Sequence, residues 1–133
     1  MSPTFPTRLL PASRVLPAPR FRYSPVVLAG GFAFVSGLVG LEPGGTGLRP
    51  GGAYEEARQI LANLRALAAE QGWSMEQLAM ARVYCADFTE FAQVNRAWEE
   101  AFADIAPPAR TSLGASGLPL GARVEMEFQF VVA

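Results

Sequence analysis

An arginine and two glutamates in the last quarter of the chain are the residues whose types and spacing best suit chemistry. Arg110 lies in the segment Pro-Pro-Ala-Arg-Thr-Ser, and Glu125 and Glu127 alternate with apolar residues in Val-Glu-Met-Glu-Phe. A guanidinium binds a planar carboxylate through two parallel hydrogen bonds in a fixed orientation. A glutamate can hold a water molecule and accept or relay its proton. The three side chains together are the candidate site of this chain.

Two predicted strands must bring these side chains together. Residues 124–132 alternate with period two, which sets the apolar side chains on one face of the strand and Glu125 and Glu127 on the other. In the shorter strand after Pro107-Pro108, Arg110 and Ser112 share a face. If the two strands lie side by side, Arg110 and both glutamates meet on one polar face of a sheet. The sequence predicts the site there.

The basic residues and the cysteine count exclude several kinds of site. All 11 basic residues are arginines, and the chain has neither lysine nor histidine. A lysine Schiff base, a histidine general base and histidine metal ligands are therefore excluded. The single cysteine, Cys85, excludes an internal disulfide framework and a cysteine-rich zinc site. Because Cys85 stands in an otherwise apolar predicted strand, we interpret it as a core residue.

Hydrophobic periodicity, glycine and proline predict the remaining elements. In order, these are a short edge strand near residues 8–10, strands over 24–29 and 32–37, a helix over 53–71, a strand over 79–86 and a helix over 89–105. Gly30-Gly31 is typical of a hairpin turn, which needs positive φ angles. Gly72 suits the left-handed position after the first helix, and Thr89 is the expected N-cap of the second.

Both predicted helices are apolar on one side, so both must pack on the same face of the sheet. The expected fold is α+β, a two-layer sandwich with a mixed sheet of about six strands and two helices on one face. With 133 residues the chain is expected to form one domain, a proline-rich segment over 1–19 preceding a core over 20–133. The second sheet face would be uncovered and partly apolar. This favours an oligomer, and an exposed sheet face in a monomer is the alternative.

Charge and hydropathy bear on partners and location. The formal net charge is −1 and no basic stripe continues into the body of the chain, which argues against a nucleic-acid partner. No apolar run is long enough for a secretory signal or a membrane span, and the prolines in residues 1–19 would break the helix of a transit peptide. We therefore expect a soluble, cytoplasmic protein without a membrane partner.

Short motifs follow one another along the chain in an order and spacing that are specific when taken together. They are Tyr23, Phe34-Val35-Ser36-Gly37, the helical residues 56–64, Asp87-Phe88 with residues 91–95, Pro108-Ala109-Arg110-Thr111-Ser112, Leu118-Pro119, and Val124-Glu125-Met126-Glu127. With these motifs the chain resembles the reactive intermediate deaminase family, also called RidA or YjgF and, under an older label, endoribonuclease L-PSP. The resemblance covers roughly residues 17–132.

The resemblance implies a chorismate mutase-like (YjgF-like) fold and a homotrimer with three clefts between subunits. Enzymes of this family hydrolyse enamine and imine intermediates, such as 2-aminoacrylate and 2-iminobutanoate, to 2-oxo acids and ammonia, without a metal or organic cofactor. The catalytic residues of the family fall on Arg110, which would bind the substrate, and Glu125, which would position the water. The other implied substrate-binding residues are Tyr23, Ser36, Gly37 and Ser112. Since an imine carbon is already electrophilic, a chain without histidine or lysine can run this reaction.

The sequence departs from the family pattern near the predicted site. Phe21-Arg22 stands where the family often has Gly-Pro, Leu38 stands in place of a frequent glutamine, and Ser112 in place of a frequent cysteine. Arg20 and Arg22 would either favour a more acidic substrate or lie on the surface. These changes leave the natural substrate open.

Three functions remain open at this point. The first is hydrolysis of small imines and enamines, and the second is binding of small carboxylates by a non-catalytic trimer through Arg110. The third, ranked last, is a ribonuclease or translation inhibitor, since an acidic chain without histidine or lysine has little with which to follow phosphates. An ordinary cross-strand ion pair is the alternative to a site at Arg110 and Glu125. Glu127 is interpreted as structural.

Overall fold

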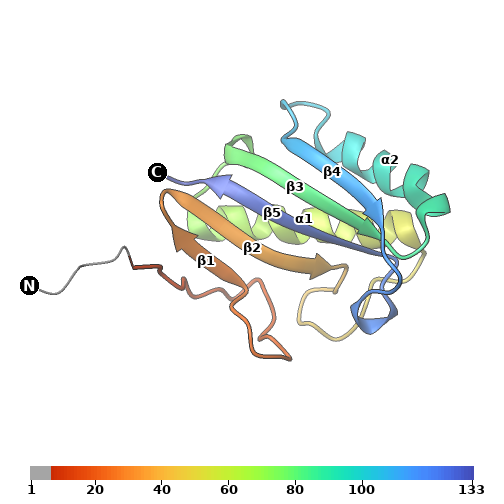
Figure 1. Cartoon of the computed structure of the whole chain (residues 1–133), viewed down its shortest axis with the longest axis horizontal. Coiled ribbons are helices and arrows are strands. Elements are labelled where there is room, and N and C mark those ends of the chain that lie inside the picture. Colours follow the sequence, from red (N-terminus) through yellow and green to blue (C-terminus); the bar gives the residue numbers. More distant parts are fainter. Residues whose placement is uncertain (1–6) are drawn as a thin grey trace, which may run out of the picture.

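The computed structural model describes residues 7–133 and shows two helices packed on one face of a five-stranded mixed sheet (Figure 1). The strands are β1 (Val26–Ala29), β2 (Phe32–Val39), β3 (Leu78–Cys85), β4 (Ala109–Gly114) and β5 (Val124–Val131), and the helices are α1 (Ala53–Gln71) and α2 (Phe91–Ala101). The strand order is β1-β2-β5-β3-β4, in which β3 and β4 run parallel and the other neighbours antiparallel. The predicted two-layer α+β sandwich is confirmed.

The described residues form a sheet of five strands, where about six were expected. The edge strand predicted near residues 8–10 is a single bridge, in which Leu9 and Leu28 exchange two backbone hydrogen bonds of 2.9 Å. Pro11 follows almost at once, and a proline has no N–H with which to extend the ladder. The first six residues of the predicted segment 1–19 lie outside the described residues.

The hairpin and the first helix form as predicted. Gly30 and Gly31 take φ angles of 58° and 82° in the turn between β1 and β2. Helix α1 ends at Gly72, whose φ of 81° is the left-handed conformation that glycine adopts without strain. Its apolar stripe, with Ile60 and Leu64 fully buried, packs against the sheet.

The second helix is shorter than predicted at both ends. It covers Phe91–Ala101, and a 3-10 turn over Phe88–Glu90 precedes it. The expected N-cap Thr89 is wrong, because the carboxylate of Asp87 accepts hydrogen bonds from the Thr89 backbone N–H at 3.0 Å and from its hydroxyl at 2.6 Å. Asp87 thus caps the 3-10 turn, and the α-helix starts only after this turn.

The core lies between the helices and one face of β5. The helix-facing residues of β5 are almost completely buried: Val124, Met126, Phe128 and Phe130. Cys85 is buried in the same core, and burial raises the pKa of its thiol, as expected of a core residue rather than a nucleophile. Within residues 7–133, no helix is long and apolar enough to cross a membrane.

No helix formed by residues 7–133 covers the other face of the sheet (Figure 1). Its residues on β5 are the half-buried Glu125, Glu127 and Gln129, because side chains alternate along a strand. The β2 residues Phe32 and Phe34 on this face are each 40% exposed. The open face is therefore partly polar and partly apolar, as the sequence predicts.

Candidate functional site

A cavity of about 620 Å³ lies where the open face of the sheet meets the N-terminal segment. Four of the six predicted site residues line it: Tyr23, Ser36, Gly37 and Glu125. The segment 15–21 and the loop 41–45 supply much of the remaining wall. The structure therefore brings together most of the site that the sequence predicts.

A bulge in β2 shapes the floor of the cavity at Ser36 and Gly37. The pairing of β2 with β5 shifts register between Val35 and Leu38. The Ser36 hydroxyl donates a 2.7 Å hydrogen bond to the carbonyl of Ser24, which ties the bulge to the chain before β1. A Cβ atom at Gly37 would lie 2.8 Å from Cδ of Glu125, so a larger residue would collide with this carboxylate. Glycine is needed here because the backbone approaches Glu125 closely.

Glu125 is half-buried on this floor. Burial raises the pKa of its carboxyl, and the nearby charge of Glu127 adds to the shift. No group in residues 7–133 donates a hydrogen bond to this carboxylate. A carboxylate without partners, in surroundings that disfavour its charge, is well suited to accept a proton.

Glu127 lies one pleat further along β5 in contrasting surroundings. The hydroxyl of Tyr84 donates a 2.5 Å hydrogen bond to its Oε1, and a guanidinium nitrogen of Arg82 lies 3.8 Å from the same oxygen. The hydrogen bond to Glu127 is the largest cause that raises the pKa of Tyr84, which keeps the phenol protonated as a donor. Sequence analysis missed both β3 residues, although their alternation with the apolar Ala81 and Val83 already set them on the polar face.

Arg110 does not lie beside Glu125, and this part of the prediction is wrong. Strand β3 separates β4 from β5, and Arg110 pairs with Ala81, which in turn pairs with Phe128 of the core. Since paired residues point to the same side of a sheet, Arg110 faces the helices and Glu125 the open face.

On the helix side, Arg110 is held by residues of α2. Its guanidinium donates a 2.8 Å hydrogen bond to Oδ1 of Asn95. The guanidinium carbon lies 5.0 Å from the ring centre of Trp98 and 5.5 Å from that of Phe91, within the range of cation–π attraction. Ser112 shares this face, and its hydroxyl oxygen is buried without a hydrogen-bond partner in the described part of the chain.

Hydrogen bonds to helix α1 hold the N-terminal segment that forms one wall of the cavity. Glu70 at the end of α1 accepts hydrogen bonds of 2.6 Å from the Ser13 hydroxyl and from the Arg14 backbone N–H. Beyond this attachment, Arg20 and Phe21 border the cavity, whereas Arg22 does not. Of the residues that depart from the family pattern, Phe21 and Leu38 thus lie at the cavity.

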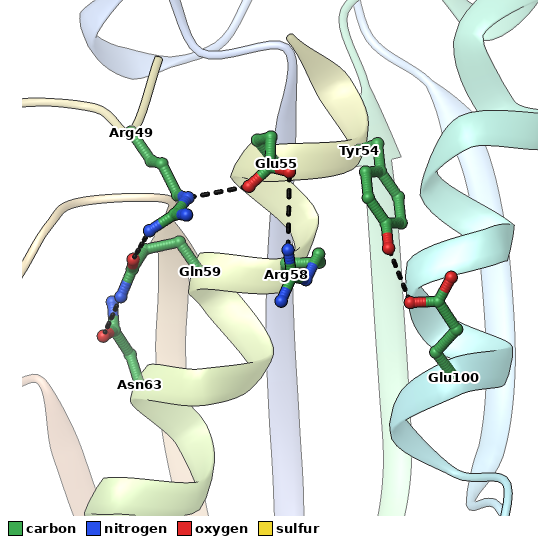
Figure 2. Close-up of polar contacts among 7 residues, drawn as sticks. All are labelled: Arg49, Tyr54, Glu55, Arg58, Gln59, Asn63 and Glu100. Atoms are coloured by element: carbon green, nitrogen blue, oxygen red, sulfur yellow. Dashed lines mark hydrogen bonds and ion pairs between the residues drawn. The ribbon is translucent and has the colours of Figure 1, made fainter. Parts of the chain in front are cut away.

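A chain of polar contacts from α1 holds the loop that forms the opposite wall (Figure 2). Arg49 pairs with Glu55 at 2.8 Å and donates to Gln59, which donates at 2.8 Å to Oδ1 of Asn63. Asn63 then donates a 2.8 Å hydrogen bond to the carbonyl of Leu41, and both residues line the cavity. The loop is therefore anchored to the helical layer.

Within residues 7–133, no group of three or more histidine, cysteine, aspartate or glutamate side chains is placed to hold a metal ion. The residues that surround the cavity carry hydroxyls, carboxylates, an amide, an arginine and apolar side chains. This set can bind a small polar molecule and move a proton.

Comparisons with known proteins cover most of the chain. The family model described as Endoribonuclease L-PSP matches residues 13–132. A RutC family protein of Aquifex aeolicus is 37% identical over 112 residues, which are 84% of this chain and 89% of that protein. The 2-iminobutanoate/2-iminopropanoate deaminase of the goat, Capra hircus, is 35% identical over 105 residues, 79% of this chain and 76% of the enzyme. The crystal structure of RidA from a Psychrobacter species superimposes with a TM-score of 0.84 at 27% identity and covers 93% of this chain and 99% of that one.

Proposed function

This chain belongs to the endoribonuclease L-PSP (RidA/YjgF) family, and from this premise we propose that it hydrolyses small enamine and imine intermediates to 2-oxo acids and ammonia. The substrates would be of the 2-aminoacrylate and 2-iminobutanoate type. The observation that carries the proposal is the cavity in which Glu125 lies beside Tyr23, Ser36 and Gly37 and accepts no hydrogen bond from residues 7–133. The family relatives that are named as imine deaminases support the class of reaction.

The position of Arg110 bears on how the site would be completed. In one protomer Arg110 and Glu125 lie on opposite faces of the sheet, but Arg110 is partly exposed on the edge strand β4. In the proposed homotrimer, the exposed part of Arg110 of one protomer faces the cavity of the next. The exposed Phe32 and Phe34 of the open face support an assembly that covers this face.

The chemistry follows from the roles of two side chains. The Arg110 guanidinium binds the substrate carboxylate through two hydrogen bonds and so fixes the imine carbon near Glu125. Glu125 takes a proton from water while the water oxygen bonds to the imine carbon, which gives a carbinolamine. Glu125 returns this proton to nitrogen, then accepts the proton of the carbinolamine hydroxyl and passes it to the same nitrogen as the C–N bond breaks and the C=O bond forms. The products are a 2-oxo acid and ammonia, and no cofactor enters the balance.

A coupled assay tests this proposal. A threonine dehydratase generates 2-iminobutanoate in place, and the release of 2-oxobutanoate and ammonia is compared with the spontaneous reaction. The protein should accelerate the release. If it binds 2-oxobutanoate but does not accelerate the release, it is a carboxylate-binding protein and the hydrolytic proposal is wrong.

Light scattering after size exclusion tests the assembly. The mass should be about three times the 14.2 kDa of the chain. A stable monomer at micromolar concentration would contradict both the trimer and a cleft completed by the neighbouring Arg110.

A further inference from the structure

Glu125 and Glu127 are successive residues on the open face of β5, and both line the cavity. The Glu125 carboxylate accepts no hydrogen bond from residues 7–133, whereas Glu127 accepts the hydrogen bond of Tyr84 and lies near Arg82. The proposed reaction uses Glu125 and leaves Glu127 and Tyr84 without a role. Two carboxylates in one cavity with such different surroundings are typical of sites in which one carboxylate adjusts the other.

The groups that face Glu125 come from several elements. Strand β3 contributes Tyr84, which pairs directly with Glu125, and Arg82, which pairs with Glu127. The other titratable or charged residues that line the cavity are Tyr23 and Arg20 from the N-terminal segment and Glu42 from the loop after β2. Glu127 is the carboxylate whose charge contributes to the pKa of Glu125, as a cause second to burial.

The contacts of Glu127 hold its charge in one place. The hydroxyl of Tyr84 and the guanidinium of Arg82 both attract the Glu127 carboxylate, which restrains its position on the open face. The 2.5 Å bond from Tyr84 also orients the carboxylate, because Tyr84 projects from the strand beside β5. A negative charge fixed next to Glu125 makes it harder for Glu125 to become negative.

We propose that Tyr84 and Glu127 are a positioning pair for Glu125: Tyr84 holds the Glu127 carboxylate, and its negative charge sets the pH at which Glu125 gives up its proton. The role of the pair in catalysis rests on the proposed function. The effect of the pair on the titration of Glu125 is independent of that function. Without the charge of Glu127, Glu125 ionises at lower pH and becomes a weaker base. Without the Tyr84 hydroxyl, the Glu127 carboxylate is free to move away, and the effect on Glu125 becomes smaller.

Carbon-13 NMR of the glutamate carboxyl groups measures this titration directly. The signal of Glu125 is identified as the one that Glu125→Gln removes. Glu127→Gln should shift the Glu125 midpoint to lower pH, and Tyr84→Phe should shift it in the same direction by a smaller amount. Glu76→Gln is the control, because it removes an equal charge from the exposed 3-10 turn before β3 and should leave the midpoint unchanged. An unchanged midpoint in Glu127→Gln overturns the proposal, and Tyr84→Phe tests the same idea independently if Glu127→Gln does not fold.

The pH profile of kcat/KM, read together with the NMR titration, distinguishes a failure of the pair proposal from a failure of the proposed function. Glu125 acts in its ionised form, so the rate falls as pH drops through its pKa, and this acid limb should move to lower pH in Glu127→Gln together with the NMR midpoint. The plateau should fall by no more than about tenfold, far less than the 10²–10⁴-fold typical of a lost acid/base group. If the wild-type protein is inactive, the hydrolytic function fails while the NMR titration still decides about the pair. An acid limb that stays in place while the protein is active overturns the pair.

Discussion

The two faces of the sheet differ most clearly along β5. Toward the helices, Met126, Phe128 and Phe130 are almost completely buried among apolar side chains. Toward the open side, Glu125 and Glu127 are half-buried in a cavity and differ from each other in their partners. Successive side chains of a strand point to opposite faces. The even-numbered residues of β5 therefore stabilise the core, and the odd-numbered residues face the candidate site.

The comparison of the two faces shows how a small sheet can hold a partly buried carboxylate, whose burial is unfavourable. Burial of large apolar side chains stabilises a fold by about 1.5–3 kcal/mol each. Partial burial of a carboxylate opposes its ionisation, as the raised pKa of Glu125 shows. The buried apolar residues on either side of Glu125, Val124 and Met126, keep its backbone in place, although its carboxylate has no hydrogen-bond donor in the described part of the chain. Substitutions on the two faces should therefore change different measured quantities.

The largest effect is expected for Glu125→Gln. Glutamine keeps the size and the hydrogen-bonding capacity but does not accept a proton as a carboxylate does, so imine hydrolysis should fall by about 10²–10⁴-fold. Binding of 2-oxobutanoate and the free energy of unfolding should change little. The coupled assay and a binding titration on the same preparation measure both, and near-normal activity would refute this mechanism.

Phe128→Ala should have the opposite profile. Loss of this buried ring leaves a cavity in the core and should lower the free energy of unfolding by about 3–5 kcal/mol. Urea unfolding measures the change. Gln129→Ala, the neighbouring substitution on the open face, should cost less than about 1 kcal/mol. If both variants lose the same free energy of unfolding, the two faces of β5 do not differ in their contribution to stability.

Arg110→Lys tests the side chain that the fold turns toward the helices. Lysine keeps the charge but loses the planar fork and the stacking on Trp98, so binding of 2-oxobutanoate should weaken about ten- to a hundredfold. Isothermal titration measures the affinity. Arg22→Lys, outside the cavity, is the control and should bind as well as the wild type. Equal binding by Arg110→Lys would exclude bidentate recognition by this residue.

The smallest effect is expected for Gly37→Ala. The new methyl group would meet the Glu125 carboxyl at 2.8 Å, and the displaced carboxylate should lower kcat/KM roughly tenfold. Gly47→Ala is a matched control, because an added Cβ there meets no atom within 4 Å. If both variants keep full activity, the close approach of Gly37 to Glu125 has no catalytic importance.

Local patterns predicted much of the fold. The alternation of residues 124–132 assigned both faces of β5 correctly, and the glycines at 30, 31 and 72 marked a turn and a helix end that the structure confirms. These features depend on neighbours in the chain, which the sequence displays directly. The start of α2 was misplaced because Asp87 competes with Thr89 for the capping role.

The candidate site was predictable only in part, for a reason of topology. Tyr23, Ser36, Gly37 and Glu125 line one cavity, as their motifs suggested. The face on which Arg110 lies depends on which strand pairs with β4 and in which register. The parallel partner β3 is reached through α2, and no local pattern reports such a pairing. The polar neighbours of Glu127 were missed for the same reason, since β3 was not known to adjoin β5.

The central place of β5 has a consequence for synthesis of the protein. This strand follows the other four in the chain and pairs with both β2 and β3, so that Phe32 meets Val131 across almost a hundred residues. A ribosome-bound chain that ends before residue 124 therefore holds a hairpin and a β3-α2-β4 unit whose inner edges are unpaired. Such edges are where nascent chains aggregate and where chaperones act. The same strand that presents Glu125 thus delays assembly of the sheet until translation has passed it.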